Sequence, residues 1–415
     1  MECCDTQNGL MPVAEAIERL MAAGGRHVPE VESVRLEEAL GRVLAEDIRA
    51  SMDVPPAANS AMDGYAIRVE DLQGAASWNL PVSQRIPAGA APLPLLPGTV
   101  ARIFTGAVMP PGADAVIMQE NTRIPEAGRV EILHPVMRGE NVRGAGQDIT
   151  CGDRIMRLGD RVGAAAVGML ASLGVARVRV YRRLRVAVVS TGDELVEPGN
   201  PLAHPGQIYN SNRYLLGALL RQSGCEVLDA GIIPDRLEDT IRTLVDLSAE
   251  TDVIVSSGGV SVGEEDHVKT AVESVGELDF WRIAIKPGKP LAFGRVGNTA
   301  FIGLPGNPQA VWITFLILAR PYLLQRQGQR SRCHIRPVSV AAGFDVSKPL
   351  KREEYFRVRI EESDSGLILS KHPNQSSGVL SSSLWADGLA CIPAGKTVRA
   401  GEMVEFYPFS AFGVA

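Results

Sequence analysis

The chain has 415 residues, of which 45% are hydrophobic and 22% charged, and its formal net charge is −6. This acidic balance argues against nucleic-acid or membrane-surface binding, and the length predicts about two to four domains. The apolar stretch 311–319 is too short to span a bilayer, and the N-terminus lacks the features of a signal peptide. The six cysteines form no C-x-x-C pair, so we expect reduced thiols in a cytoplasmic protein without a zinc site.

The N-terminal part predicts a helical frame with a turn-rich insertion. Apolar residues recur at helical spacing in 10–23 and again in 160–174. Between them, residues 51–147 are rich in proline and glycine and contain short apolar runs, which are typical of β-strands. We therefore predict a discontinuous helical domain, 10–50 plus 148–183, and an inserted β-rich lobe over 51–147.

Strands and helices alternate over 184–331. Strand-like runs occupy 185–190, 226–233 and 252–256, and helical runs occupy 212–222, 237–249 and 265–275. This order predicts a three-layer αβα domain around a parallel sheet, in which ligands bind beyond the carboxyl ends of the strands. The last segment, 332–415, has short alternating strands separated by turn residues, which predicts a small β-barrel. The predicted fold class is therefore multidomain α/β.

Two glycine-rich turns follow predicted strands of the α/β domain. The run Ser-Ser-Gly-Gly-Val-Ser-Val-Gly at 256–263 lets the backbone approach a ligand and present amides to an anion. The alternative is a tight turn without a ligand. The run Ile-Gly-Leu-Pro-Gly-Asn-Pro at 302–308 predicts a stiff corner before a long apolar helix, with Asn307 as N-cap and Pro308 at the first helical position. We expect the exposed amides of this corner to suit an anion as well.

Four acidic side chains follow strands or turns at one predicted edge of the sheet. Asp193 and Glu194 follow the first strand, Asp235 follows the second, and Asp266 follows the glycine-rich turn. Clustered carboxylates repel one another unless a cation lies between them, and hard oxygen ligands suit Mg²⁺. We therefore predict a magnesium site at this edge. For Asp266, a favourable place at a helix N-terminus is an equally good explanation.

A basic wall is predicted opposite these acids. Side chains alternate over 280–286, with Arg282 and Lys286 on one face and hydrophobic residues on the other. The sequence Pro-Gly-Lys-Pro places prolines on both sides of Lys289 and stiffens the backbone that presents this lysine. The alternative is a charged strand edge in solvent.

Other candidates are ambiguous by themselves. Ser60 and Asp63 have the spacing of a helix-capping box, which explains them better than catalysis does when they are considered alone. Near the C-terminus, Arg352 and Arg357 lie on one predicted strand, and Ser376, Ser377 and the serines at 381–383 crowd one loop. Serine hydroxyls and an arginine could hold a tetrahedral oxyanion, but a flexible surface loop is equally consistent with this pattern.

Together these segments resemble the molybdopterin molybdenumtransferase family, which includes MoeA and the gephyrin E-domain. The resemblance covers nearly the whole chain and rests on motifs that occur in the family's order. They are Ser-Ala-Met-Asp-Gly-Tyr-Ala at 60–66, Thr-Gly-Asp-Glu-Leu at 191–195, Ser-Gly-Gly-Val-Ser-Val-Gly-Glu at 257–264, Ile-Lys-Pro-Gly-Lys-Pro at 285–290 and Gly-Leu-Pro-Gly-Asn-Pro at 303–308. Each motif alone is weak evidence, whereas the set is highly specific.

The resemblance implies an enzyme that inserts molybdenum from molybdate into adenylated molybdopterin and releases AMP, assisted by Mg²⁺. It also implies an elongated homodimer, in which the site forms between the α/β domain of one chain and the β-rich lobe of the other. A molybdopterin adenylyltransferase is implied as the transient partner that supplies the substrate.

The family's site residues carry over to this chain position by position. The resemblance implies catalytic roles for Asp63, Glu194, Asp235, Asp266, Lys286 and Lys289, with Glu194, Asp193, Asp235 and Asp266 as metal ligands. With the motifs above, it implies substrate contacts from Thr105, Asp148, Thr191, Gly192, Asp193, Ser257, Gly258, Gly259, Val260, Ser261, Arg282, Pro305, Gly306, Asn307, Pro308, Arg357, Ser376 and Ser377. Three positions depart from the family: Arg282 stands where a lysine is usual, Gln147 replaces a common glutamate before Asp148, and Arg236 follows Asp235 where a second acid is frequent.

Two other functions stay open from the sequence. A related α/β domain adenylylates molybdopterin, although the extra lobe and barrel disfavour that activity here. A pterin-binding scaffold without turnover is the other, since the gephyrin E-domain also serves in anchoring. An assay with adenylated molybdopterin and molybdate separates these possibilities.

Overall fold

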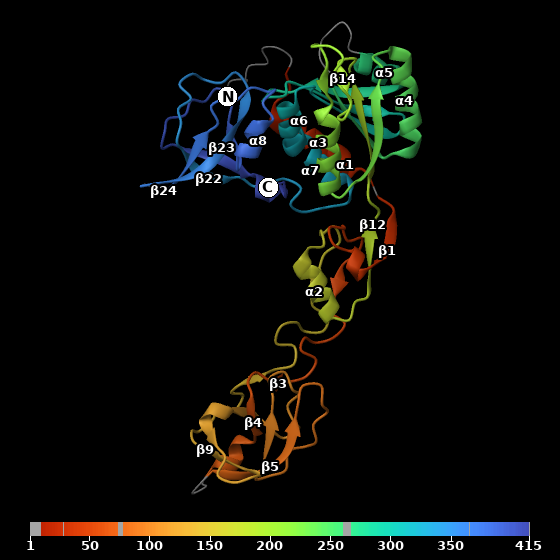
Figure 1. The fold of residues 1–415 in the computed structure, drawn as a ribbon. Coiled ribbons are helices and arrows are strands. Elements are labelled where there is room, and N and C mark those ends of the chain that lie inside the picture. The colour runs from red at the N-terminus through yellow and green to blue at the C-terminus, as the bar shows by residue number, and fades with distance from the viewer. Residues whose placement is uncertain (1–9, 28, 74–77, 260–266, 365, 415) are drawn as a thin grey trace, which may run out of the picture.

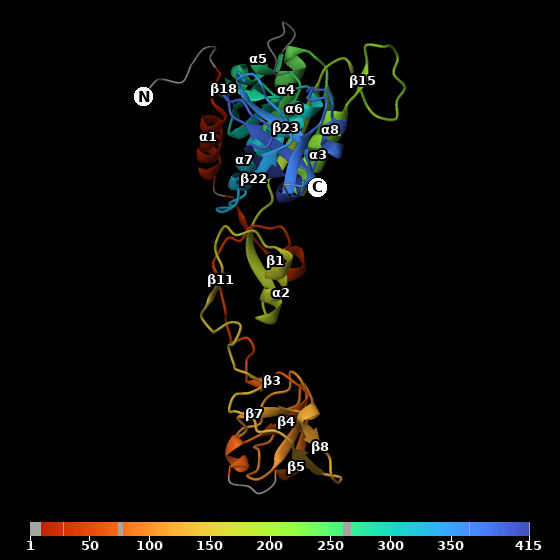
Figure 2. The ribbon, with the colours of Figure 1, turned by 90° about the vertical axis from the view of Figure 1, so that its left-hand side faces the viewer.

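The computed structural model describes residues 10–27, 29–73, 78–259, 267–364 and 366–414. The molecule is elongated: a large head holds both the α/β unit and the C-terminal barrel, and a slender arm leads from it to a distal lobe (Figures 1 and 2). The chain runs down the arm, through the lobe and back before it forms the α/β sheet. Among the described residues, none of the helices combines the length and the apolar character needed to cross a bilayer.

The head is built around a six-stranded sheet in the order β16-β13-β17-β21-β20-β18. In that order the strands are Glu226–Ile233, Arg185–Thr191, Val253–Ser257, Thr299–Leu304, Pro290–Val296 and Gly276–Arg282. The first four are parallel, as predicted, but β20 and β18 run antiparallel to their neighbours. The sheet is therefore mixed, because only Gly297 and Asn298 join β20 to β21, a connection too short for a crossover helix.

Helices cover both faces of this sheet and make the predicted three layers. On one side lie α1 (Val13–Gly25), α3 (Ser211–Gln222), α6 (Pro308–Thr314) and α7 (Arg320–Arg326), and on the other lie α4 (Leu237–Glu250) and α5 (His267–Val275). Side chains of β13 alternate between the layers: Val186 and Val188 pack in the first core, and Ala187 and Val189 in the second. Burial on both faces explains why this strand is one unbroken apolar run.

Helix α1 packs on the head, although the sequence grouped it with the arm. Its buried residues Val13, Ala16 and Leu20 share one core with Leu323 of α7. We therefore propose that 11–25 belongs to the α/β unit, and the other domain boundaries stay predictions.

The apolar helix after the 302–308 corner begins at Pro308, as predicted, but it is not uniform. A π-helical turn, η4 (Phe315–Ala319), separates α6 from α7, and all of η4 is buried. Pro321 follows in the first turn of α7. Because proline has no amide and its ring collides with the carbonyl four residues earlier, the preceding turn widens.

The C-terminal barrel is closed. Its strands are β22 (Val338–Ala342), β23 (Glu353–Ser363), β24 (Gly366–Lys371), β25 (Gly388–Ile392) and β26 (Met403–Pro408). Pairing runs from β23 through β24, β22, β26 and β25 back to β23, around a core that includes Phe356 and Phe406. A short strand of the α/β unit, β19 (Ile285–Lys286), pairs in parallel with the start of β23 and joins the two parts of the head.

The arm contains more strand than the predicted helical domain, and the lobe is a β-sheet. In the arm, β1 (Val31–Arg35) pairs with β12 (Arg177–Tyr181) beside the short helix α2 (Ala164–Ser172). Val34, Val178 and Val180 alternate with exposed residues, and this period of two favours strands. The lobe is a six-stranded sheet in the order β7-β4-β6-β5-β9-β8. Those strands are Ala115–Met118, Gly64–Ile67, Val100–Ile103, Asn79–Ile86, Arg129–Ile132 and Thr122–Arg123.

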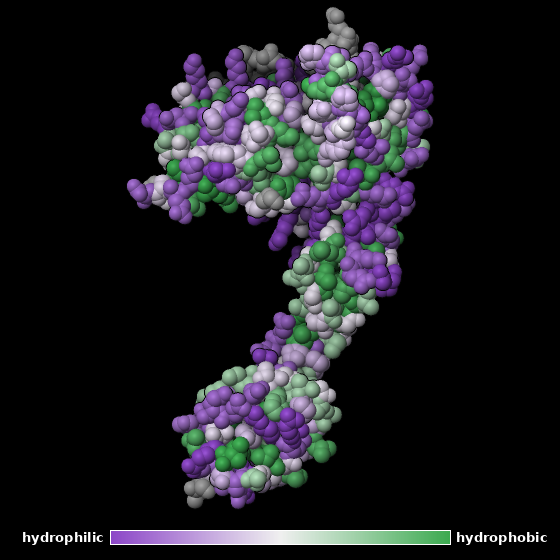
Figure 3. Space-filling model, viewed as in Figure 1, coloured by the Kyte–Doolittle hydropathy of each residue, from purple (hydrophilic) through white to green (hydrophobic). Residues whose placement is uncertain are grey.

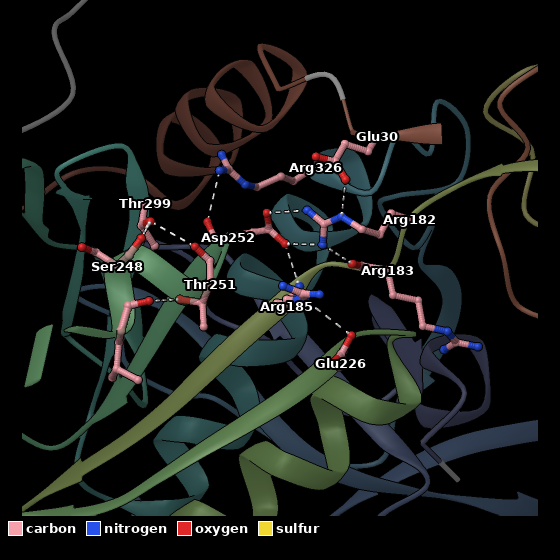
Figure 4. Close-up of polar contacts among 11 residues, drawn as sticks. Glu30, Arg182, Arg183, Arg185, Glu226, Ser248, Thr251, Asp252, Thr299 and Arg326 are labelled. Atoms are coloured by element: carbon pink, nitrogen blue, oxygen red, sulfur yellow. Dashed lines mark hydrogen bonds and ion pairs between the residues drawn. The ribbon is translucent and has the colours of Figure 1, made fainter. Parts of the chain in front are cut away.

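A network of ion pairs joins the arm to the base of the head (Figure 4). Arg182 makes two hydrogen bonds to the Asp252 carboxylate, at 3.0 and 2.9 Å, and the Arg185 amide donates to the same carboxylate at 2.7 Å. Arg326 of α7 donates to the Asp252 carbonyl at 3.1 Å, and Arg182 pairs with Glu30 at 3.2 Å. Burial alone would raise the pKa of Asp252, but the hydrogen bonds from Arg182 and Arg185 outweigh it and hold that pKa below its ordinary value.

Candidate active site

A cavity of about 830 Å³ opens at the carboxyl ends of β13, β17 and β21, where the α/β unit meets the barrel. It is lined by Thr191, Gly192, Glu194, Ile208, Asp235, Gly258, Gly259, Lys286, Pro287, Gly288, Lys289, Pro290, Pro305, Gly306, Asn307, Ala310, Arg352, Gln375, Ser376 and Ser377. Segments far apart in the sequence therefore share one concave surface, at the edge of the sheet where α/β proteins bind ligands.

Glu194 and Asp235 bring acidic side chains to this cavity. They follow β13 and β16, which are parallel neighbours, so both acids reach the same edge of the sheet. Asp193 does not line the cavity, but its carboxylate accepts a hydrogen bond from the Asp235 amide at 3.4 Å. Gly192 makes room for this arrangement, because its φ is 139° and a Cβ there would meet the Glu194 carboxylate.

The acids of the cavity are compatible with the predicted Mg²⁺ ion only where oxygen atoms from outside the protein supply most of its ligands. The described part of the chain contains no group of three or more acidic, histidine or cysteine side chains that could hold a metal. Mg²⁺ commonly takes one or two carboxylates and completes its octahedron with phosphate and water oxygens, so Glu194 and Asp235 would suffice. The predicted metal ligand Asp266 and the predicted substrate contacts Val260 and Ser261 lie outside the described residues.

Asn212 ties the two glycine-rich turns together. Its side-chain amide donates to Ser257 Oγ at 2.8 Å and to the Gly306 carbonyl at 2.6 Å. Ser257 is buried and also donates to the Pro305 carbonyl at 3.4 Å. Sequence reasoning missed this asparagine, because a polar residue in the first turn of a helix is ordinarily explained by capping.

Gly258 and Gly259 turn the backbone along the cavity, with φ values of 87° and 65°. A Cβ on Gly259 would lie 2.8 Å from Thr191 Oγ1 and would also meet Val268 of α5. Both the backbone conformation and the available space therefore require glycine at position 259.

The 302–308 corner is capped by the barrel instead of by its own asparagine. Asn307 takes the N-cap position and lines the cavity, but its side chain makes no capping hydrogen bond, and Pro308 lies outside the lining. The Gln309 amide, which such a cap could satisfy, donates to the Ser377 carbonyl at 3.0 Å. The Gln309 amide, just beyond the corner, is therefore occupied by the barrel and not available to an anion.

Lys286 and Lys289 bring basic side chains to the same cavity. Lys286 makes an ion pair at 2.8 Å with Glu354, which is 5% exposed. Arg352 also lines the cavity, where it donates to the Ile285 carbonyl at 2.9 Å. The sequence offered it beside Arg357 as a candidate, but the family's site residues did not include it. Acids and cations that come from different segments thus share one space.

The predicted continuous strand over 280–286 is broken into pieces of two sheets. Strand β18 ends at Arg282, and β19, a strand of the α/β unit that pairs in the barrel's sheet, begins at Ile285. Ile283 and Ile285 are fully buried while Lys286 is exposed, so the predicted alternation of faces holds at these positions. Arg282 does not line the cavity, and its substrate contact stays a prediction.

Arg357 holds the barrel loop that reaches the cavity. It is 1% exposed, and its guanidinium donates to Ser382 Oγ at 3.1 Å and to the Ser376 carbonyl at 3.2 Å. Gln375, another residue that the sequence did not suggest, makes hydrogen bonds of 3.0 Å to both the carbonyl and the amide of Arg357. Gln375, Ser376 and Ser377 line the cavity, whereas Arg357 does not. Burial lowers the pKa of Arg357 to about 10.

Asp63 and Thr105 lie in the distal lobe, at the far end of the arm from the head (Figure 1). Asp63 accepts hydrogen bonds of 2.8 Å from both the amide and the hydroxyl of Thr105, which hold the pKa of Asp63 below its ordinary value. The predicted helix cap at Ser60 is wrong, because β3 (Asn59–Ser60) and β4 flank this turn. Asp148 also lies away from the cavity, so a single chain does not bring these three residues to it.

Three family models match the chain in order. They are described as the MoeA N-terminal region (domain I and II) over 11–174, a probable molybdopterin binding domain over 187–325 and the MoeA C-terminal region (domain IV) over 339–409. Molybdopterin molybdenumtransferase of Haemophilus influenzae is 39% identical over 384 residues, which cover 92% of this chain and 94% of that protein. Gephyrin of Dictyostelium discoideum is 32% identical over 396 residues, which cover 85% of this chain and 55% of that protein. The crystal structure of a molybdopterin biosynthesis MoeA protein from Pyrococcus horikosii matches with a TM-score of 0.78 and 33% identity, over 96% of this chain and 99% of that one.

Proposed function

The chain belongs to the MoeA family of molybdopterin molybdenumtransferases, and from this we propose that it inserts molybdenum from molybdate into adenylated molybdopterin and releases AMP. The observation that carries the proposal is the cavity of about 830 Å³, in which Glu194 and Asp235 share one space with Lys286 and Lys289. A phosphoanhydride and an oxyanion are both negatively charged, so a site that holds them together needs compensating cations.

We assign the substrate's phosphate and pterin to the glycine turn at 258–259 and the corner at 305–307, whose backbones line the cavity. Lys286 and Lys289 attract molybdate and offset negative charge as AMP departs. The described residues of the cavity present no activated nucleophile, which supports catalysis by charge and position.

Glu194 and Asp235 would hold Mg²⁺ together with the phosphate oxygens. When bound, this ion would neutralise charge on the phosphoanhydride. The proposal is supported by the placement of both carboxylates in the cavity, because without a cation they would repel the substrate's phosphates.

We propose that the lobe of a second copy completes the site with Asp63, Thr105 and Asp148. The arm supports a homodimer, because hydrophobic residues gather on its surface over α2 (Figure 3). A groove of about 560 Å³ lies there, whose lining is apolar except for Asp153 and Arg154; the apolar members are Ile149, Ile155, Met156, Ala165, Ala166 and Met169. Apolar surfaces of this kind commonly mark contacts between proteins. A transient adenylyltransferase partner and a cytoplasmic location remain expectations from the sequence.

Single-turnover mixing tests the proposed function. The purified chain is combined with adenylated molybdopterin, Mg²⁺ and molybdate, and AMP and pterin-bound molybdenum are measured. We expect both products in equal amounts, with AMP release that depends on molybdate. ATP-dependent adenylylation of molybdopterin, or pterin binding without AMP release, would assign the chain to one of the alternative functions.

A further inference from the structure

The position of Glu354, a residue of the barrel, indicates a role that the site described above does not include. This inference rests on the proposed function. Glu354 lies near the start of β23, is 5% exposed and is not itself part of the cavity lining. Its carboxylate pairs with Lys286 Nζ at 2.8 Å. A buried carboxylate without a partner is strongly destabilising. The contact therefore stabilises Glu354 and also restricts the position of Lys286.

The contact is built into the pairing of two strands. β19 and β23 run parallel, and Lys286 and Glu354 are direct partners in their register. The Glu353 amide donates to the Ala284 carbonyl at 3.1 Å, which fixes the backbones on the N-terminal side of the pair. The barrel therefore restrains a lysine whose flexible four-carbon stem would otherwise let its ammonium move freely.

The pair is asymmetric. The Lys286 side chain is 51% exposed and lines the cavity, whereas the Glu354 side chain is 6% exposed. The negative end is thus anchored inside the protein, and the positive end reaches the cavity. A carboxylate in contact with an ammonium cancels much of the attraction that this ammonium exerts on another anion.

The two lysines of the cavity are therefore not equivalent. Lys289 is exposed in the cavity and takes part in none of the ion pairs between described residues. The positive charge of Lys286 is partly neutralised by the carboxylate of Glu354. An anion that enters the cavity therefore meets Lys289 and the already paired Lys286. The third cation of the lining, Arg352, is tied to the Ile285 carbonyl.

We propose that Glu354 is a positioning residue, which holds Lys286 in place and lowers the positive charge of the cavity so that Lys289 is the principal cation for the incoming oxyanion. The lower positive charge matters because the oxyanion has to be transferred to the pterin and not only bound. An oxyanion held by two uncompensated lysines is bound more tightly in the ground state, and ground-state binding by itself does not speed its transfer.

Substitution of Glu354 by Gln tests this assignment, with Glu361→Gln as the control. Glu361 lies on the same strand but is exposed and remote from the cavity lining. For E354Q at low salt, we expect molybdate alone, without pterin, to bind about three- to tenfold more tightly by calorimetry. Turnover of adenylated molybdopterin should fall about tenfold, because Lys286 is no longer held in place. E361Q should leave both values unchanged.

Removal of each lysine gives a second measurement. In the natural background, Lys289→Met should weaken molybdate binding several-fold more than Lys286→Met does. In the E354Q background, Lys286→Met should become the more damaging change, because Lys286 is then free to bind the anion. If E354Q does not fold, the comparison of the two lysine variants in the natural background still tests whether Lys289 is the principal cation.

The proposal is overturned if folded E354Q binds molybdate with unchanged or lower affinity, or if the two lysine variants are equal in the natural background. A merely structural role for Glu354 would lower the thermal midpoint and weaken binding together. Molybdate binding that follows the prediction in a chain that releases no AMP would support the role of Glu354 and contradict the proposed function, so the two failures are distinguishable.

Discussion

Glu194 is the acid of the cavity whose surroundings are most restrictive. It occupies the space that a side chain at position 192 would need, and it shares the sheet edge with Asp235. Its carboxylate is thus placed by the backbone of the turn after β13, whereas the cations of the cavity come from β19, from the turn after β19 and from the barrel. Because the acid and the cations come from different segments, Glu194 can be substituted without moving Lys286 or Lys289.

We expect Glu194→Gln to slow AMP release about a hundredfold, because one charged ligand of the proposed Mg²⁺ is lost. Its free energy of unfolding should change by less than about 1 kcal/mol, since the substitution leaves the core intact. Glu250→Gln, at an exposed position that ends α4, is the control and should change neither value. Single-turnover kinetics and urea unfolding measure the two quantities, and an unchanged rate would remove Glu194 from the mechanism.

At the scale of elements, the site depends on turns that support one another. Asn212 of α3 bridges the turn at Ser257 to the corner at Gly306, and the barrel loop caps the helix that follows. None of these turns is held by its own residues alone. A change in the shape of one turn should therefore be felt in the others.

We predict that Gly259→Ala destabilises the protein by about 2–4 kcal/mol, because it adds a steric collision to the cost of a left-handed backbone. Gly98→Ala is the matched control: its φ is 69°, close to the 65° of Gly259, but a Cβ there meets nothing within 4 Å. The control should cost only about 1 kcal/mol. Equal losses in urea unfolding of the two variants would show that crowding at position 259 is unimportant.

At the scale of the whole molecule, the arm sets the distance between the lobe and the head. The Asp252 network is one of the places where the head anchors this arm, since Arg182 comes from the segment that leaves β12. If the lobe serves a second copy, the direction of the arm decides whether its residues reach that copy's cavity. The junction between arm and head then matters for activity, although it lies at the end of the sheet opposite to the cavity.

We expect Asp252→Asn to lower the free energy of unfolding by about 1–3 kcal/mol at pH 7, because Arg182 loses a charged partner. The folded-state pKa of Asp252 is depressed, so its contribution is present above the ordinary carboxyl pKa of about 3.9 and is lost as pH falls through the folded value. The difference between natural chain and variant should thus be constant from about pH 7 to 5 and shrink below about pH 4.

Urea unfolding across this pH range measures the effect. Asp239→Asn, which removes an exposed pair with Arg242 on α4, is the control and should cost less than about 0.5 kcal/mol. A difference that persists undiminished to pH 3 would contradict the proposed role of the Asp252 charge.

The shared site can be tested by complementation between copies. Asp63→Ala removes a lobe acid, and Glu194→Ala removes a cavity acid, so each variant alone should be nearly inactive. After exchange of subunits, mixed dimers contain one intact site, and we expect about a quarter of the natural rate. Activity that stays absent although mixed dimers form, as shown by affinity tags, would place both acids in a site within one chain. An Asp63→Ala chain that is active by itself would exclude Asp63 from the site.

The sequence by itself determined the alternation of strands and helices over 185–275, the start of the apolar helix at Pro308 and the delivery of Glu194 and Asp235 to one sheet edge. These features follow from hydrophobic periodicity, turn residues and short connections, all of which are local. Only the tertiary structure decided that Glu354 pairs with Lys286 and that Asn212 bridges two turns. It also decided that the Ser377 carbonyl caps α6. These contacts join segments that are far apart in the chain, so the local sequence pattern of neither segment indicates them.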